Sequence, residues 1–261
     1  MDSIAPVDGP YINLDGKKLL DFSSCDYLGL AQHPEVKKGA IKYALKYGVG
    51  ALLNSFPQKE VEKKLAQYLN KEIALLLTSD IDVTALKKTK IKEITDTLGM
   101  VGDNGFGSAS EGDVVYGALH FGGANFIAGP KKQLASFTEE KISFQALGAI
   151  DCALSFIPEM EQERKMVLKH KSWLVKQLSD FSLKEEKMPK AILTSPEADA
   201  IRQFLMQEQI YLAPSSSNSL YFAITALHTP DDLDQLAVAL KKLSEIDLAL
   251  ATQLLTPTPS R

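Results

Sequence analysis

Residues 113–129 read DVVYGALHFGGANFIAG, and this stretch decides which fold the sequence can support. Its first part, VVY at 114–116, is a short run of strand-favouring residues, and the pair Gly122-Gly123 interrupts the pattern. A second run, NFIA at 125–128, ends at a glycine that is followed by proline. We therefore predict a strand, a turn and a second strand.

Composition limits the class of protein. The chain has 261 residues, of which 45% are hydrophobic and 24% are charged, so it predicts a globular protein with one large domain or two smaller ones. The net charge of -4 argues against nucleic acid and against an anionic membrane surface as partners. No apolar run approaches the length of a membrane span, and the N-terminus lacks a basic, apolar leader, so we expect a cytoplasmic protein.

Cysteine and arginine are both scarce. Cys25 and Cys152 lie far apart, without metal-binding spacing, so we expect no metal centre and predict that each is a small buried apolar group. Only Arg164, Arg202 and Arg261 carry a planar guanidinium group that could bind a carboxylate or a phosphate through bidentate hydrogen bonds.

Periodicity predicts further helices and strands in an α/β arrangement. Pro34 lies in the first turn of a predicted helix that Gly48 closes. Residues 73–78 predict a buried strand by their length and apolarity. The first helix should turn an apolar stripe inward, made of Val36, Ala40, Ile41, Ala44 and Leu45. The other predicted elements are a hairpin at 9–22, helices at 58–69, 139–157, 158–179 and 195–207, strands at 210–213 and 219–226, and a helix from 229.

Two segments near the N-terminus carry a family resemblance. FSSCDYLGLAQHP at 22–34 and YGVGA at 47–51 resemble the entry segments of the α-oxoamine synthases, the pyridoxal-phosphate (PLP) acyltransferases that include 8-amino-7-oxononanoate synthase. The resemblance implies a truncated mixed sheet of the fold-type-I aminotransferase kind, with an α+β small domain at the C-terminus. It also places Cys25 and Tyr27 at the substrate site, although the family has asparagine where this chain has Cys25.

The turn at 117–122, GALHFG, resembles the family's turn that carries the Schiff-base lysine. Phe121 stands at the lysine position, so the resemblance implies that PLP is not bound covalently. His120 is the neighbouring candidate for a surviving general base; the alternative is a polar histidine at a strand end.

Other cofactor positions are altered too. The strand at 73–78 resembles the one that leads to the family's phosphate-binding amides, which places Ser79 there, but Asp80 follows it. The segment from 93 to 102 resembles the family segment whose aspartate and histidine contact the cofactor ring. In this alignment the aspartate corresponds to Glu93 and the histidine to Asp96. A shift of the alignment by three residues would put Asp96 in the aspartate's place. Between these segments the family has several more elements, whereas this chain has the lysine-rich connector 81–92, which we expect to be a solvated loop rather than a binding element.

Residues 220–243 resemble the family's C-terminal signature. Ser219 and Tyr221 occupy the places of its arginines, one of which binds the substrate carboxylate, and His228 is expected to cap or pack rather than to catalyse. We divide the chain into an N-terminal segment 1–50, a shortened large domain 51–157, a small domain 158–255 and a tail 256–261.

Three functions are compatible with these features. The first is a non-catalytic relative of the acyltransferases that condense an acyl thioester with an amino acid, acting as a partner subunit in a homodimer or in a heterodimer with a full-length synthase. The second is a residual PLP-dependent transferase of the biotin-pathway type. The third is a decaying gene product without a role. Losing strands from the sheet would expose apolar edges that need covering by rearrangement or by a partner.

Overall fold

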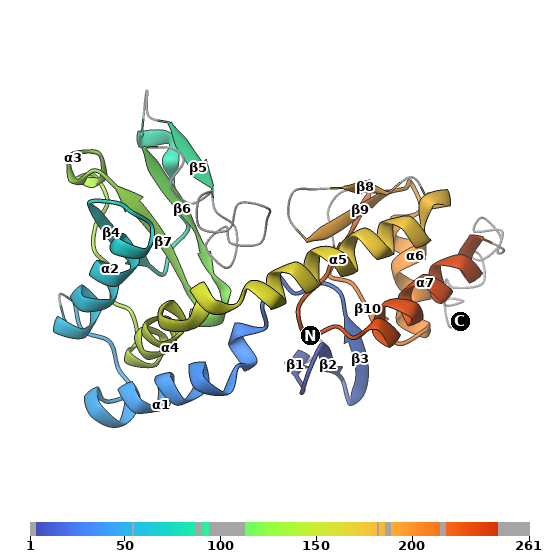
Figure 1. Cartoon of the computed structure of the whole chain (residues 1–261), viewed down its shortest axis with the longest axis horizontal. Coiled ribbons are helices and arrows are strands. Elements are labelled where there is room, and N and C mark those ends of the chain that lie inside the picture. The colour runs from blue at the N-terminus through green and yellow to red at the C-terminus, as the bar shows by residue number, and fades with distance from the viewer. Residues whose placement is uncertain are drawn as a thin grey trace, which may run out of the picture. The chain divides into compact units, whose positions relative to one another are not determined.

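The computed structural model describes residues 4–53, 55–86, 90–93, 113–181, 183–185, 189–214 and 218–244 (Figure 1). The chain divides into two compact units. One unit joins Met1–Cys25 to Lys165–Arg261, and the other is Asp26–Arg164. Both units combine helices and sheet, so the predicted α/β class is confirmed. The sequence-based division at 50, 157 and 255 stays a prediction.

The unit Asp26–Arg164 is built on a four-stranded sheet with the order β4-β7-β6-β5. Strand β7 (Ala124–Gly129) is antiparallel to both of its neighbours, β4 (Ile73–Leu77) and β6 (Val114–Leu119). Strand β5 (Ile91–Glu93) lies parallel to β6. A 3-10 turn, η5 (His120–Gly122), joins β6 to β7 and confirms the predicted strand, turn and strand. Strands β4, β5 and β6 therefore run in the same direction and end at the same edge of the sheet.

The helices of this unit begin where the sequence supplies capping groups. Helix α1 (Pro34–Tyr47) follows His33, whose Nδ1 accepts from the Glu35 amide. The side chains of Ser55 and Ser143 cap α2 (Phe56–Tyr68) and α4 (Phe144–Phe156) in the same manner. Helix α4 contacts both α1 and α2, and α2 packs against β4 (Figure 1). The remaining short elements of the unit are η1 (Leu30–Gln32), η2 (Val83–Ala85), α3 (Lys131–Leu134) and η6 (Ile157–Glu159).

Helices α1 and α4 cross with their backbones in close contact. A Cβ atom on Gly39 would lie 2.5 Å from the carbonyl oxygen of Gly148, which is closer than real Cβ atoms approach. The prediction that the apolar stripe of α1 faces inward is therefore partly wrong, because the side of the helix that carries Gly39 packs against α4. Ile41 is 58% exposed and Leu45 is 84% exposed, whereas Val36 is buried as predicted.

The connector after β4 packs against the sheet. Ile81 and Val83 are partly buried there and Leu86 is buried, which corrects the expectation of a solvated loop for this part of the connector. Its lysine-rich residues 87–89 lie outside the described residues. The buried members of the cluster are Leu75, Leu77, Leu86, Val114, Ile127 and Leu134.

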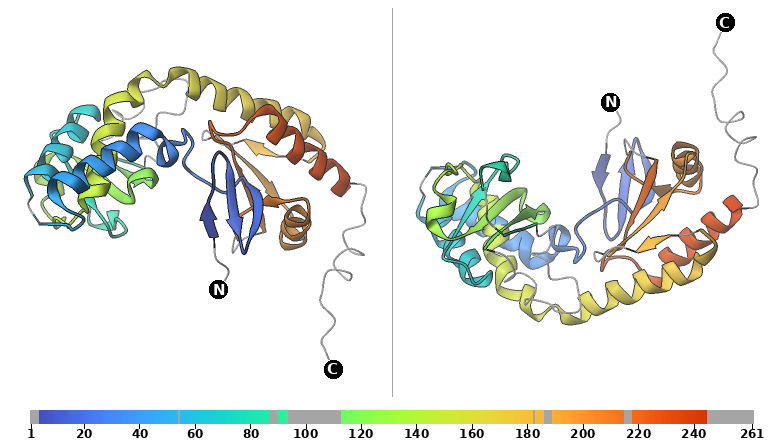
Figure 2. Two further views of the ribbon diagram at one scale, coloured as in Figure 1. Left: turned by 90° about the horizontal axis from the view of Figure 1, so that it is seen from below. Right: turned by 90° about the horizontal axis from the view of Figure 1, so that it is seen from above.

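The other unit brings the two ends of the chain together. The predicted N-terminal hairpin forms β2 (Tyr11–Leu14) and β3 (Lys17–Asp21), and β3 pairs in parallel with β10 (Ile210–Tyr211). Figure 2 shows these blue strands beside the orange elements from the C-terminal half. The other strands and the helices are β1 (Ile4–Pro6), β8 (Lys184–Glu185), β9 (Lys190–Thr194), β11 (Ser219–Ala223), α5 (Glu161–Gln177, of which residues from Lys165 belong here), η7 (Ser179–Phe181), α6 (Ala198–Gln207) and α7 (Pro230–Ser244).

A backbone hydrogen bond and an apolar cluster hold the two sheets of this unit together. The sheet β11-β9-β8 joins the first sheet through the Ala223 amide, which donates to the Phe22 carbonyl at 2.8 Å. One apolar cluster fills the space between the sheets and the helices, and Phe22 and Phe222 lie fully buried within it.

Within the described ranges, no helix is long and apolar enough to cross a membrane.

Candidate functional site

The candidate site lies at the edge of the four-stranded sheet where β4, β5 and β6 end. Ser79 follows β4, Glu93 ends β5 and His120 follows β6. Parallel strands present their carboxyl ends at one edge, and ligands of open α/β sheets bind there. The structure thus brings three predicted positions to the same edge. Asp96 lies outside the described residues.

The turn η5 packs against helix α4. Phe121 is 8% exposed. A Cβ atom on the neighbouring Gly122 would lie 2.6 Å from Cγ1 of Ile150 in α4, so the turn is pressed against that helix. Gly123 completes the turn with a φ of 59°, a left-handed conformation that glycine adopts without strain. The position at which the resemblance places a lysine therefore carries a buried phenyl ring.

His120 is exposed and lies near a buried carboxylate. The turn η5 contacts η1, which begins at Leu30, and Asp26 accepts hydrogen bonds from the amides of Leu30 and Ala31, both at 2.8 Å. Burial raises the pKa of Asp26, while these hydrogen bonds and the charge of His120 lower it. An imidazole can act as a general base in principle, but it does not form a stable imine.

Tyr27 and Cys25, the predicted substrate residues, differ in exposure. Tyr27 is 2% exposed and belongs to the core of its unit. Cys25 is exposed, so the expectation that it is a buried apolar group is wrong. Cys152 is half-buried; its thiol donates to the Glu35 carbonyl at 3.1 Å, and burial raises its pKa.

The turn after β4 binds an anion supplied by the protein itself. The carboxylate of Glu140 accepts hydrogen bonds from the Thr78 amide at 2.7 Å and from the Ser79 amide at 3.0 Å. It also accepts from the hydroxyls of Thr78 and Ser79. These hydrogen bonds, the one from the Ser79 hydroxyl first, lower the pKa of Glu140 to about 2. Glu140 is therefore ionised at neutral pH.

A buried polar network holds the segment that carries Glu140. Gln58 of α2 donates to the Glu140 carbonyl at 2.8 Å and to the Glu62 carboxylate at 3.0 Å. Glu62 in turn accepts from the Leu76 amide of β4 at 3.2 Å. Burial raises the pKa of Glu62, while the hydrogen bonds from Gln58 and Leu76 lower it. Helix α2 thus ties the Glu140 segment to the edge of the sheet.

His228, in the other unit, is a packing residue. It is 2% exposed and stacks on Phe22 with ring centroids 4.3 Å apart. Its Nδ1 accepts from the Thr225 amide at 3.0 Å, and its Nε2 donates to the Asp21 carbonyl at 3.1 Å. Burial lowers the pKa of His228 to about 4, so the ring is neutral at pH 7.

Ser219 and Tyr221 lie on β11, and neither side chain carries the positive charge of the arginines that the resemblance places there. The hydroxyl oxygens of Ser219 and Thr194 are 3.3 Å apart. The ammonium group of Lys190 lies 5.5 Å from the centroid of the Tyr221 ring. Among the residues that the structure describes, no group of three or more His, Cys, Asp or Glu side chains could hold a metal ion.

Comparison with known sequences finds relatives that match part of this chain. A cysteate-C-fatty acyltransferase of Capnocytophaga ochracea is 42% identical over 76 residues, which cover 26% of this chain and 18% of that protein. An 8-amino-7-oxononanoate synthase of Thermoanaerobacter pseudethanolicus is 42% identical over 77 residues, covering 27% and 20%. This chain is related to the α-oxoamine synthases. The match spans about a fifth of these relatives' length, and no protein-family model matches the chain.

Solved α-oxoamine synthase structures have the same fold. A serine palmitoyltransferase of Sphingomonas wittichii superposes with a TM-score of 0.75 at 14% identity, over 94% of this chain and 92% of that one. An 8-amino-7-oxononanoate synthase from Francisella tularensis gives 0.68 at 13% identity, over 87% and 98%. A high-resolution structure of SPT with a PLP internal aldimine gives 0.74 at 14% identity, over 94% of each chain. The fold expected from the α-oxoamine synthase resemblance is thus observed as a mixed α/β fold.

The described residues do not fit PLP bound in the manner that the α-oxoamine synthase resemblance implies. Glu140 takes the amides of Thr78 and Ser79, which the resemblance assigns to the cofactor phosphate. A second anion at the same amides would be repelled by that carboxylate. Phe121, at the lysine position, offers no amine. We therefore derive no reaction step through PLP.

Sequence reasoning missed Glu140. It lies in SFTEEK at 136–141, a polar run without a family motif or a regular spacing. It is 61 residues from Ser79 along the chain, and no local signal connects the two. The sequence contains one indication that this turn is altered: Ser79, at the expected phosphate-binding position, is followed by Asp80 and Asp82.

Proposed function

We propose that this chain is a non-catalytic relative of the PLP-dependent synthases that condense an acyl thioester with an amino acid, and that it works as a partner subunit of a full-length synthase. Phe121 carries the proposal. A Schiff base needs a primary amine on the turn after β6, and a phenyl ring cannot supply one. A side chain at the neighbouring position 122 would collide with Ile150, since a Cβ atom there would lie 2.6 Å from its Cγ1.

Exposed apolar side chains of α1, of the loop after it and of the first residue of α2 support a role in binding a partner. Six large apolar side chains between residues 41 and 56, here named the α1 face, are at least 49% exposed. Large apolar groups gathered at the surface of a soluble protein mark interaction sites. The α1 face consists of Ile41, Leu45, Val49, Leu52, Leu53 and Phe56.

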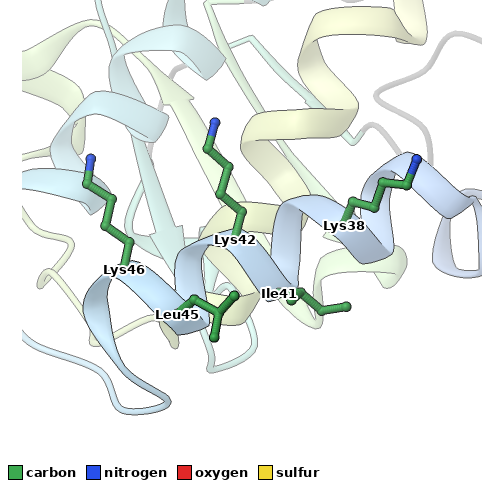
Figure 3. Close-up of a pocket in the computed structure, with 5 residues that line it drawn as sticks. All are labelled: Lys38, Ile41, Lys42, Leu45 and Lys46. Atoms are coloured by element: carbon green, nitrogen blue, oxygen red, sulfur yellow. The ribbon is translucent and has the colours of Figure 1, made fainter.

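The charges beside the α1 face indicate what kind of partner fits. Ile41 and Leu45 line a shallow pocket together with Lys38, Lys42 and Lys46, whose side chains point to the other side of α1 in Figure 3. A second copy would bring three more lysines close to the same surface, and like charges at a contact are unfavourable. We therefore commit to a different chain, a full-length synthase subunit that presents acidic side chains to the lysines.

Loss of catalysis is tested by adding PLP to the purified protein, recording the absorbance spectrum, reducing with borohydride and mapping the peptides. We expect no visible aldimine band and no adduct at one particular lysine. A band with an adduct on a single lysine would overturn the non-catalytic assignment and make that lysine the catalytic candidate.

The partner is tested by co-expression with a full-length α-oxoamine synthase encoded in the same genome. We expect the two chains to co-purify, and Leu45→Glu to abolish the complex. Val238→Glu is the matched control, because Val238 is 53% exposed on α7 and outside the α1 face. A protein that stays folded but binds itself or nothing would contradict the proposed partner, and failure to accumulate as a folded protein would favour a decaying gene product.

A further inference from the structure

One side of helix α1 is covered by α4. That side consists of Gly39, Tyr43 and Tyr47, which follow one another at intervals of four residues and are here named the inner row. Gly39 packs against the backbone of α4, and Tyr43 donates to the Asp151 carboxylate at 2.9 Å. The ring of Tyr47 lies against that of Phe144, with centroids 5.5 Å apart. The inner row therefore fixes which side of α1 faces the rest of its unit.

The opposite side of α1 is apolar and exposed. Each residue of an α-helix is rotated by about 100° from the one before, so a residue two positions along points to nearly the opposite side. Ile41 and Leu45 each stand two positions after a member of the inner row, and both are exposed. A helix with apolar residues on two opposite sides is typical of one that packs between two neighbours. Helix α4 is one neighbour, and among the described residues no second neighbour covers Ile41 or Leu45.

The loop that carries further members of the α1 face is held from behind. The Phe144 amide donates to the Gly50 carbonyl at 3.0 Å, and Ala51 forms a β-bridge with Ser143. The start of α4 thus fixes the backbone of this loop. A surface that is already ordered loses less conformational freedom when a partner binds.

A row of lysines runs beside the exposed apolar residues of α1. Lys38, Lys42 and Lys46 follow one another at intervals of four residues and line the same shallow pocket (Figure 3). Lys38 pairs with Glu35 of its own helix at 2.6 Å. Lys42 is exposed and makes no ion pair with any residue that the structure describes. The charge of Lys42 is therefore available to a carboxylate of a partner.

We propose that α1 docks an amphipathic helix of the partner chain, with apolar side chains on Ile41 and Leu45 and carboxylates along the lysine row. Residues four apart form a ridge, and such a ridge packs into the grooves of a second helix. Helices bound in this manner present apolar anchors at intervals of three and four residues. The inference rests on the proposed function, which assigns the α1 face to a different chain, and it adds which element of that chain binds.

The test is a titration of the full chain with a fluorescently labelled synthetic peptide of about 20 residues, long enough for a helix when bound. The acidic peptide carries leucines at positions i, i+3, i+4 and i+7 of its pattern with glutamates beside them, and the matched basic peptide has lysines in place of the glutamates. We expect the acidic peptide to bind about tenfold more tightly and to gain helix in circular dichroism. Equal affinity for the two peptides, or binding without a gain in helix, would overturn the proposal.

Substitutions in the chain locate the bound peptide. Lys42→Glu should weaken binding of the acidic peptide about tenfold, because attraction becomes repulsion. Lys132→Glu is the matched control, since Lys132 is exposed on α3 and outside the α1 face, and we expect it to leave the affinity unchanged. Leu45→Glu should abolish binding. An equal loss in Lys132→Glu would assign the effect to general charge and would sink the proposed site.

A further peptide tests the helical conformation itself. Proline in the middle of the acidic peptide breaks a helix while the charges and the leucines stay. We expect this peptide not to bind. Unchanged affinity would mean that the α1 face takes an extended segment, which contradicts the proposal.

Two other occupants of the α1 face are distinguished with the same variants. Vesicles that contain phosphatidylserine test an anionic membrane surface, and sedimentation velocity of the chain alone tests a second copy. Binding to the vesicles, or self-association, that is lost in Leu45→Glu would overturn the assignment to a helix of another chain.

The proposed function can fail separately from the helix. A chain that binds the acidic peptide but co-purifies with no full-length synthase would support the helix and refute the synthase. A synthase complex that Lys42→Glu leaves intact, in a chain that does not bind the peptide, would support the synthase and refute the helix.

Discussion

Gly39 and Gly148 touch where α1 crosses α4, and neither helix can approach the other so closely with a side chain at these positions. A Cβ atom on Gly148 would lie 2.3 Å from the Gly39 carbonyl oxygen. We expect Gly148→Ala to lower the free energy of unfolding by about 1–3 kcal/mol or more, because the backbone must move apart. Gly50→Ala is the control, since a Cβ there meets no atom within 4 Å. Denaturant unfolding of the two variants measures the difference; equal stabilities would contradict the observed crossing.

Asp26 accepts hydrogen bonds from two backbone amides, one buried and one partly buried, and its replacement should destabilise the protein. In Asp26→Ala the amides of Leu30 and Ala31 lose the acceptors they now have at 2.8 Å. Each buried donor left without a partner costs about 1–3 kcal/mol. Asp26→Asn retains one acceptor oxygen and should lose less. Thermal unfolding of the pair gives the comparison, and an alanine variant as stable as the asparagine variant would argue against this role.

His228 should make the protein less stable in mild acid. Its pKa is about 4 in the folded state against an ordinary value of 6.5, so between these pH values the unfolded chain binds more protons. Stability contributed by the neutral ring is complete above about pH 6.5 and is lost as the pH falls towards 4. The loss between pH 7 and pH 5 is about 2 kcal/mol. Unfolding measured at both pH values should show a smaller decrease in His228→Gln; an equal decrease would assign the effect to other groups.

The α1 face should contribute little to the stability of the isolated chain. Leu45 is 84% exposed, so Leu45→Ser should change the free energy of unfolding by no more than about 0.5 kcal/mol. Val36 lies on the same helix and is 2% exposed, so Val36→Ala should cost about 1.5–3 kcal/mol. Denaturant unfolding checks both values. A large loss in Leu45→Ser would show that the side chain is covered in solution.

Local patterns predicted the elements that depend on neighbouring residues. The proline at position 34 and the glycine at 48 mark the ends of α1 because they limit the backbone directly. The apolar run at 73–78 matches β4, and the glycines at 122 and 123 match the turn between β6 and β7. These signals act over a few residues, so the sequence displays them without knowledge of the tertiary fold.

The errors concern contacts between distant residues. Ile41 and Leu45 fit an inward stripe by spacing, but the Gly39 contact with Gly148 turns another face of α1 towards α4. The anion at the turn after β4 comes from Glu140, which no local pattern connects to Ser79. The candidate site could therefore be located from the sequence, at the ends of β4 and β6, but its occupant could not.

The pairing of β3 with β10 determines when the two units can form during synthesis. All contacts within Asp26–Arg164 are available once the ribosome has passed that segment, and the hairpin of β6 and β7 needs only the short connection 120–123. Strand β3 must wait for a partner about 190 residues later, Ile210 opposite Leu20. Domains generally fold as units while the chain emerges. The nascent chain therefore carries an N-terminal hairpin whose outer strand β3 has one edge without its partner for most of synthesis, and a stop before β10 would release a chain in which that edge stays uncovered.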